Sequence, residues 1–197
     1  MNVVIAPHAD DEVLGCGGIL DSNFHVYYCG IDEFHVISME DRLKEIEEVA
    51  GFLNFSYEVA DHQTVNRYDG RVFIDIFQDL INLRKPEKIF IPYTSYNQDH
   101  QEIYHAAMIA LRPHDKNFFV KKVLVYEGLD CFWMNPKYEV NHFVPIDIEA
   151  KITAYQLHQS QVREHRSLEA IRALAVLRGA MIGAPHAEAF IVKRWVE

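Results

Sequence analysis

Residues 3–12 read Val-Val-Ile-Ala-Pro-His-Ala-Asp-Asp-Glu, an apolar run followed at once by a histidine and three consecutive acidic residues. The apolar run predicts a buried first strand. Carboxylates this close repel one another, so a fold that keeps them together needs a counter-charge. A bound cation is one candidate, because His8 and Asp11 offer the nitrogen and oxygen donors that suit zinc. The other interpretation is an acidic helix start that complements the helix dipole.

The composition describes an ordinary soluble protein. A chain of 197 residues is long enough for one domain with a substantial core, and we expect a single domain, 1–197. The formal net charge of -10 argues against nucleic acid and against anionic membrane surfaces as partners. The three cysteines are too few and too scattered for a disulfide framework or a cysteine-ligated zinc. No run approaches the ~18 to 20 apolar residues of a transmembrane segment, so we expect a cytoplasmic protein.

Strand and helix patterns alternate along the first 126 residues. We expect strands at 3–5, 25–30, 57–59, 88–92 and 123–126, and helices at about 13–22, from 38, at 73–84 and at 101–111. This alternation predicts an α/β fold, a Rossmann-like three-layer sandwich with a mostly parallel sheet of strand order 3-2-1-4-5. In that order the first strand lies beside the fourth, and the ligand crevice opens between their carboxyl ends.

The loop after the fourth predicted strand brings a second group of polar residues to this crevice. It contains Asp99 and His100, while His8 and Asp11 follow the first strand. A catalytic zinc keeps three protein ligands and leaves one position for water. His8, Asp11 and His100 supply that number, so we predict a site for zinc or another divalent transition metal.

Two motifs resemble those of the LmbE-like (PIG-L-type) N-acetylglucosaminyl deacetylases. Pro7-His8-Ala9-Asp10-Asp11-Glu12 is similar to the family's Pro-His-Pro-Asp-Asp-Glu signature. Asn97-Gln98-Asp99-His100 is similar to its His-Pro-Asp-His motif, with Asn97 in place of the first histidine. Weaker similarities extend over nearly the whole chain: Lys151-x-x-Ala154 with Ser160-Gln161, Ala175-x-x-Arg178-Gly179, and Ala187-Glu188-Ala189-Phe190.

The resemblance implies a hydrolase that removes the N-acetyl group from an N-acetylglucosamine-type sugar or glycoconjugate. In that mechanism a zinc-bound water is the nucleophile and Asp10 is the general base. Asp99 would support the ligands, and Glu12 would orient them. The oxyanion of the tetrahedral intermediate would be held by the metal and by Asn97, Tyr93 or Tyr96.

Further residues have both a functional and a structural interpretation. Arg42 with Glu45 resembles the family's Arg-x-x-Glu, in which the arginine faces the sugar, but it is also a typical i, i+3 surface pair. Asp61 matches a substrate-contacting aspartate or is simply a turn residue. The aromatic residues Phe132, Trp133 and Tyr138 could stack on a sugar or pack internally. We interpret the C-terminal segments as scaffold, with His158 or His186 as alternative neighbours of the pocket.

Two other classes of protein are alternatives to a deacetylase. A non-catalytic sugar-binding protein with a structural zinc site is the alternative that Ala9 and Asn97 favour. A nucleotide-dependent oxidoreductase is disfavoured, because Gly15-Cys16-Gly17-Gly18 lies inside a predicted helix and lacks the spacing of a dinucleotide fingerprint. The expected partner is a small acetylated sugar, and a homo-oligomer is an open alternative.

Overall fold

The computed structural model describes residues 1–33, 36–60, 64–131 and 139–197. Within them, seven strands form one sheet of order β3-β2-β1-β4-β5-β7-β6. The strands are β1 (Asn2–Ala6), β2 (Phe24–Tyr28), β3 (Ser56–Val59), β4 (Lys88–Pro92), β5 (Lys122–Tyr126), β6 (His142–Pro145) and β7 (Ala187–Trp195). The α-helices are α1 (Asp11–Cys16), α2 (Met39–Leu53), α3 (Gly70–Arg84), α4 (Gln98–Ala110), α6 (Ile148–Leu157) and α7 (Leu168–Ala180).

The predicted α/β fold and the strand order 3-2-1-4-5 are both confirmed. Strand β1 pairs in parallel with β2 on one side and with β4 on the other. The sheet then continues through two strands that the prediction did not place in it. β7 runs antiparallel to β5, and β6 runs antiparallel to β7.

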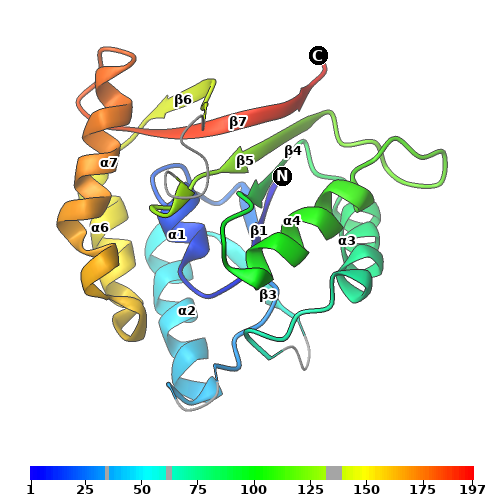
Figure 1. Cartoon of the computed structure of the whole chain (residues 1–197), viewed down its shortest axis with the longest axis horizontal. Coiled ribbons are helices and arrows are strands. Elements are labelled where there is room, and N and C mark those ends of the chain that lie inside the picture. Colours follow the sequence, from blue (N-terminus) through cyan, green and yellow to red (C-terminus); the bar gives the residue numbers. More distant parts are fainter. Residues whose placement is uncertain (34–35, 61–63, 132–138) are drawn as a thin grey trace.

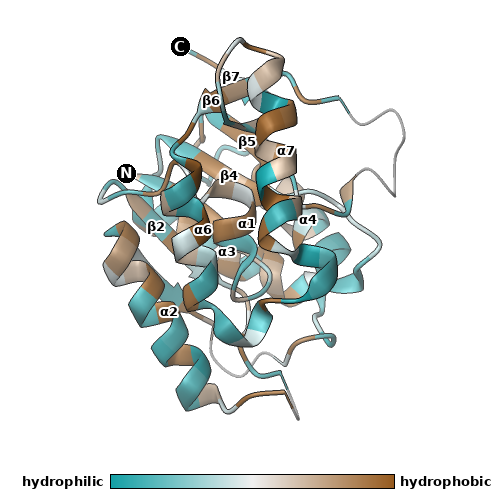
Figure 2. Cartoon of the chain, turned by 90° about the vertical axis from the view of Figure 1, so that its left-hand side faces the viewer, coloured by the Kyte–Doolittle hydropathy of each residue, from teal (hydrophilic) through white to brown (hydrophobic). Residues whose placement is uncertain are grey.

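Helices cover both faces of the sheet, which makes the predicted three layers (Figure 1). One apolar core lies under α1, α2, α6 and α7 and includes Val4, Val26 and Phe190. The other lies under α3 and α4 and includes Val3, Ile5 and Ile91. Figure 2 shows the hydrophobic strands β4 and β5 behind helices that carry both hydrophilic and hydrophobic residues, and α7 exposes Val176 and Leu177. No helix in the described part of the chain has the length and apolar character needed to cross a membrane.

Two of the differences between the predicted and the observed helix boundaries concern the crevice. Helix α1 ends at Cys16 instead of continuing to residue 22, because the chain leaves the helix at Gly17 and Gly18. Helix α4 begins at Gln98 instead of 101, because the Asn97 side chain accepts a hydrogen bond from the Asp99 backbone N–H and caps the helix. His100 therefore lies in the first turn of α4 and not in the preceding loop.

Helix α1 packs closely against the sheet at Gly15. A side-chain carbon added at Gly15 would overlap the aromatic ring of Tyr126 on β5. The Tyr126 hydroxyl donates a hydrogen bond of 2.8 Å to the Ile5 carbonyl on β1. From the C-terminal side, Lys151 donates to the Leu14 carbonyl at 2.8 Å and to the buried Glu188 carboxylate at 2.7 Å. These contacts fix the helix whose first residues carry the acidic cluster.

We predict different effects of two Gly→Ala substitutions on the free energy of unfolding. Gly15→Ala should lower the free energy of unfolding by about 1–3 kcal/mol, because the methyl group overpacks a filled site. Gly51→Ala, in α2, should leave it unchanged or raise it by about 0.5–1 kcal/mol, since nothing lies within 4 Å of the added carbon. Urea denaturation of both variants measures the effects. Equal changes in the two variants would contradict the close packing of α1.

Candidate metal centre and active site

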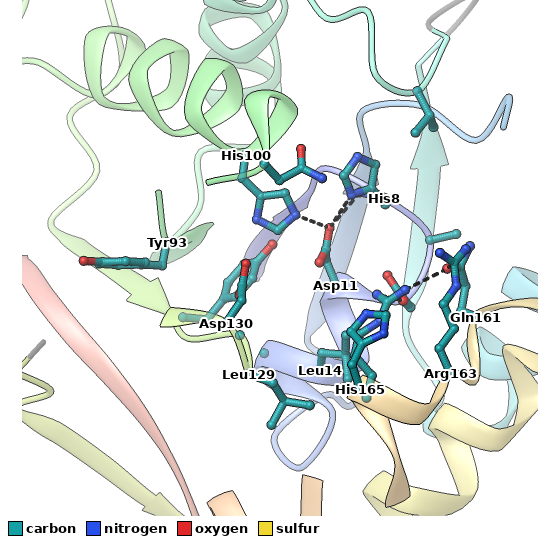
Figure 3. A pocket seen from close by; sticks show the side chains of 18 of the residues that line it. His8, Asp11, Leu14, Tyr93, His100, Leu129, Asp130, Gln161, Arg163 and His165 are labelled. Atoms are coloured by element: carbon teal, nitrogen blue, oxygen red, sulfur yellow. Dashed lines mark hydrogen bonds and ion pairs between the residues drawn. The ribbon is translucent and has the colours of Figure 1, made fainter. Parts of the chain in front are cut away.

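A cavity of about 610 Å³ opens at the carboxyl ends of the parallel strands. The turns that follow β1, β2, β4 and β5 contribute to its lining, which is the usual position of the ligand crevice in an open α/β sheet. A further wall comes from residues 161–166, just before α7. Figure 3 shows His8, Asp11 and His100 together in this cavity, with Tyr93 on one side and Arg163 on the other.

Three side chains in the cavity have the arrangement of a metal site. His8, Asp11 and His100 each offer one donor atom, and these atoms all lie within 4.8 Å of one another. Asp11 Oδ2 is 3.3 Å from His8 Nδ1 and 3.2 Å from His100 Nε2. Two imidazoles and one carboxylate form a donor set that fits zinc and related transition metals. The predicted convergence of the β1 and β4 loops is thus observed in the structure.

Asp99 lies behind this group and fixes the orientation of one imidazole. Its Oδ2 accepts a hydrogen bond of 3.0 Å from His8 Nε2 and one of 2.6 Å from the Asn66 backbone N–H. With Nε2 so used, Nδ1 is the ring nitrogen of His8 that faces Asp11. Burial favours a low pKa for His8, but the hydrogen bonds to Asp11 and Asp99 outweigh it and raise that pKa to about 10. The same negative charges would attract a divalent cation.

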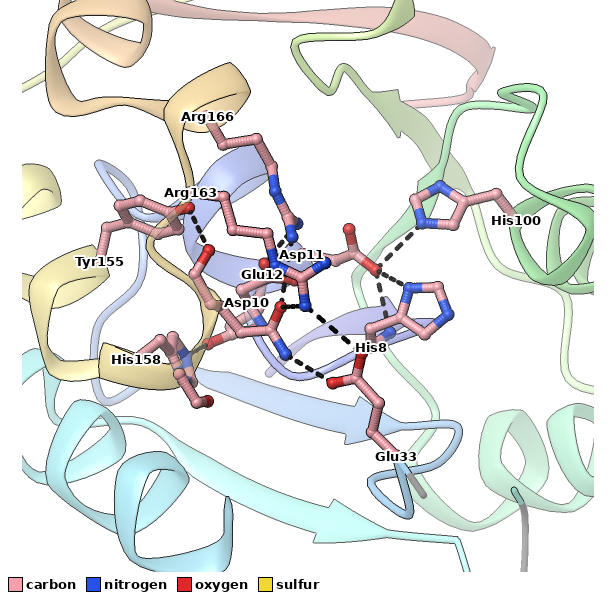
Figure 4. A network of polar contacts seen from close by, with 12 residues as sticks. His8, Asp10, Asp11, Glu12, Glu33, His100, Tyr155, His158, Arg163 and Arg166 are labelled. Carbon is pink, nitrogen blue, oxygen red and sulfur yellow. Dashed lines mark hydrogen bonds and ion pairs between the residues drawn. The ribbon is translucent and has the colours of Figure 1, made fainter. Parts of the chain in front are cut away.

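Each acid of the consecutive Asp10-Asp11-Glu12 run has its own basic partner (Figure 4). Asp10 Oδ2 accepts a 2.5 Å hydrogen bond from Arg166 Nη1. Glu12 Oε1 accepts one of 2.6 Å from His158 Nε2, and both of these side chains are fully buried. Glu12 Oε2 also accepts from the Asp10 backbone N–H at 3.0 Å. The acidic helix start is therefore real, but its carboxylates are buried and individually paired instead of solvated.

The backbone of Asp10 is strained. Its φ of 140° lies in a region that residues with a side chain rarely adopt. The carboxyl group is 1% exposed, and its Oδ1 has no hydrogen-bond partner among the described residues. Burial raises the pKa of Asp10 to about 7, although Arg166 acts in the opposite direction. An oriented carboxylate with one uncommitted oxygen is what a general base requires.

Asn97 borders the cavity, and its amide orientation follows from its role as a helix cap. Only the side-chain oxygen can accept the 2.8 Å hydrogen bond from the Asp99 N–H. The Nδ2 group is therefore the part of Asn97 that remains for a ligand. This geometry is compatible with the predicted donation to an oxyanion.

Arg42 also borders the cavity but is only 1% exposed, so its interpretation as a surface residue is wrong. Its guanidinium binds Glu33 at 2.7 Å, Glu45 at 3.2 Å and Ser160 at 2.5 Å. The predicted Arg42–Glu45 pair thus exists inside a buried network. Asp61 and the aromatic residues Phe132, Trp133 and Tyr138 lie outside the described residues.

Apart from Gln161, the residues of the wall at 161–166 carry no sequence signal of their position at the cavity. Arg166 contacts Asp10, and Arg163 and His165 line the same cavity. His158 acts through Glu12 and does not line the cavity, and neither does His186. No local pattern marks these arginines, because their acidic partners, Glu33 and Asp10, lie 130 and 156 positions earlier in the chain. The similarity at Ser160-Gln161 was the nearest available signal.

Fold and site together define a Rossmann-like α/β protein with a metal-type triad at its crevice, and structures of the same fold are known. No protein-family model and no curated protein sequence matches the chain. The conserved protein TT1542 from Thermus thermophilus is 22% identical, with a TM-score of 0.79 over 100% of this chain and 95% of that one. N,N'-diacetylchitobiose deacetylase from Pyrococcus horikoshii is 19% identical, with a TM-score of 0.75 over 98% and 83%.

A third similar structure has a different activity. GalB, the 4-carboxy-2-hydroxymuconate hydratase from Pseudomonas putida KT2440, is 18% identical, with a TM-score of 0.77 over 100% of this chain and 98% of that one. The fold expected from the resemblance is thus confirmed, since a sugar deacetylase shares it. Because a hydratase shares it too, function has to be argued from the side chains of this chain.

We predict that His100 is needed to retain a metal ion and that His105 on the same helix is not. After loading with zinc and dialysis, the parent should hold one ion per chain by elemental analysis, and His100→Ala well below one. His105→Ala is the matched control, because His105 is exposed and is not part of the triad. Asp99→Asn should weaken metal affinity by about 10- to 100-fold by freeing the His8 ring.

The opposite pattern would contradict this ligand set. If His100→Ala retains a full equivalent of zinc while His105→Ala loses it, the ion binds elsewhere on α4.

Proposed function

We propose that the protein is a zinc-dependent N-deacetylase of the LmbE-like (PIG-L) type, acting on an N-acetylglucosamine-type sugar or glycoconjugate. The observation that carries this proposal is the placement of Asp10 beside the His8, Asp11 and His100 group in one cavity. A metal site with a purely structural role would gain nothing from a buried carboxylate, such as that of Asp10, that lies beside the ligands without being one of them. The deacetylase of the same fold from Pyrococcus horikoshii supports the assignment.

In this proposal His8 Nδ1, Asp11 and His100 hold the ion, and Asp99 keeps the His8 ring in place. Zinc, when bound, supplies a Lewis acid that polarises the acetyl carbonyl and lowers the pKa of water toward ~7. Asp10 accepts the proton of the attacking water through its uncommitted Oδ1 and returns a proton to the departing amine. Arg166 holds the other carboxylate oxygen and keeps Asp10 in this orientation during both transfers.

Two further residues receive roles in the same scheme. Asn97 Nδ2 donates to the oxyanion that forms on the acetyl group. Arg42 holds Glu33 and Ser160 at the edge of the cavity and so shapes the sugar site. Cys16 and Cys29 are free buried thiols, which supports the expected reducing compartment, the cytoplasm.

Acetate release from a panel of N-acetylated hexosamines, with and without added zinc, tests the proposed function. The parent should release acetate only when zinc is bound. Asp10→Asn should keep the metal and lose most of its turnover, because removal of a general base costs about 10²- to 10⁴-fold. Binding of the sugars without acetate release by the zinc-loaded parent would instead favour the non-catalytic sugar-binding alternative.

The Asn97 assignment is tested with a substitution that separates its two functions. Asn97→Ser retains a side-chain oxygen that can cap α4, so the melting temperature should stay close to that of the parent. It removes the amide donor, so kcat should fall by about 10²- to 10³-fold with little change in KM. Asn97→Ala should lose both the cap and the donor.

Steady-state kinetics and thermal unfolding of both variants provide the measurement. If Asn97→Ser turns over at the parental rate, Asn97 is not the oxyanion donor, and Tyr93 and Tyr96 become the residues to test.

A further inference from the structure

Two arginines on one wall of the cavity are oriented by a single buried amide. Gln161 Oε1 accepts hydrogen bonds from Arg163 Nη2 at 3.4 Å and from Arg166 Nη2 at 3.2 Å. Gln161 is 5% exposed, and its own Nε2 donates to Glu33 Oε2 at 3.0 Å. The hydrogen bond to Glu33 therefore fixes the orientation of the Gln161 amide, whose oxygen faces both guanidinium groups.

Arg163 is less fully paired than the two buried arginines Arg42 and Arg178. Arg42 is bound by Glu33 and Glu45, and Arg178 forms a two-pronged pair with Glu127 at 2.8 and 2.7 Å. Arg163, by contrast, makes two long side-chain contacts within the described residues, each of 3.4 Å and each through Nη2. Its side chain is 40% exposed at the cavity wall.

Arg166 has one hydrogen-bond donor without a partner among the described residues. Its Nη1 binds Asp10 and its Nη2 binds Gln161. Its Nε is buried and has no hydrogen-bond partner among the described residues. A buried N–H without a partner is costly, so a ligand group that accepts from it would be favoured.

We propose that Arg163 and Arg166 form a subsite for a carboxylate or phosphate group carried by the substrate. Guanidinium groups present planar sets of donors that match these anions, and charge-assisted hydrogen bonds of this kind are stronger than neutral ones. The inference rests on the proposed function, since the anionic group belongs to the acetylated sugar. Figure 3 places Arg163 and His165 on the other side of Asp11 from Tyr93, and all four residues line the same cavity. The anionic group would therefore bind in the cavity that contains the metal-type triad.

The subsite adjoins the proposed reaction centre. Arg166 contacts Asp10 directly, and Asp10 immediately precedes Asp11, a member of the metal-type triad (Figure 4). An anionic substituent bound by Arg163 and Arg166 therefore lies close to the acetamido group that Asp10 serves. The preferred substrate is accordingly an acidic sugar, because a neutral sugar has no group for Arg163 and Arg166 to bind.

The first experiment compares acidic and neutral sugars on the zinc-loaded, full-length protein. N-acetylglucosamine is the neutral reference. N-acetylglucosamine 1-phosphate and 6-phosphate test a phosphate, and N-acetylmuramic acid tests a carboxylate. At least one acidic sugar should have a kcat/KM about 10- to 100-fold above the neutral one, the effect of one charge-assisted contact. The class with the larger gain identifies the anion.

Arg163→Gln should reduce this preference to near one, mainly by raising KM for the acidic sugar. Arg71→Gln is the matched control, because Arg71 is 88% exposed on α3 and pairs with Asp69 outside the cavity. It removes the same charge and should leave the preference unchanged. The proposal is overturned if the parent uses all four sugars equally well, or if Arg163→Gln keeps the parental preference.

A binding measurement separates this proposal from the proposed function. If no sugar releases acetate, titration calorimetry with inorganic phosphate still compares the zinc-loaded parent with the same two variants. The metal contributes equally to phosphate binding in all three proteins, so a difference in affinity between them measures the contribution of the substituted arginine. Phosphate should bind Arg163→Gln about 10- to 100-fold more weakly than the parent and Arg71→Gln. Equal affinity in all three proteins would overturn the subsite whatever the reaction.

Discussion

Three consecutive buried acids at the start of α1 are the constraint on which the rest of this structure depends. Asp10, Asp11 and Glu12 are between 0% and 6% exposed, and buried carboxylates without partners would be strongly destabilising. The fold resolves this by giving each acid a different basic group. Asp11 faces two imidazoles, Asp10 faces Arg166, and Glu12 faces His158. Because the partners differ, neighbouring acids acquire different chemical properties.

The core of the fold could be predicted because its information is local. Apolar runs such as 88–92 mark strands directly, and β4 begins and ends at those residues. The alternation of strands and helices then fixes handedness and order, which places β1 beside β4. His8, Asp11 and His100 could be inferred to meet for the same reason, since topology alone brings their two loops together. The start of α4 was misplaced because the capping role of Asn97 depends on its conformation.

The wall of the cavity could not be predicted, because it depends on contacts that no spacing rule encodes. Arg166 is separated from Asp10 by 156 positions, and Arg163 is separated from Glu33 by 130. Both arginines lie in or beside short 3₁₀ turns after the parallel part of the sheet, where hydrophobic periodicity is weak. For Arg42 the i, i+3 spacing was informative about its partner but not about its burial. Burial followed only from the packing of α2 against the segment that carries Ser160.

The pairings of Glu12 with His158 and of Asp10 with Arg166 also have a consequence for folding during synthesis. The acidic run is synthesised before its partners, since the basic groups that match Asp10 and Glu12 follow 156 and 146 positions later. A nascent chain that ends at β5 therefore contains neither Arg166 nor His158, so burial of Asp10 and Glu12 at that stage would leave each carboxylate without its basic partner or require it to be protonated. The native pairing of both acids requires the segment between α6 and α7, which carries His158 and Arg166. Asp10 and Glu12 thus depend for their native surroundings on residues that are synthesised 156 and 146 positions after them.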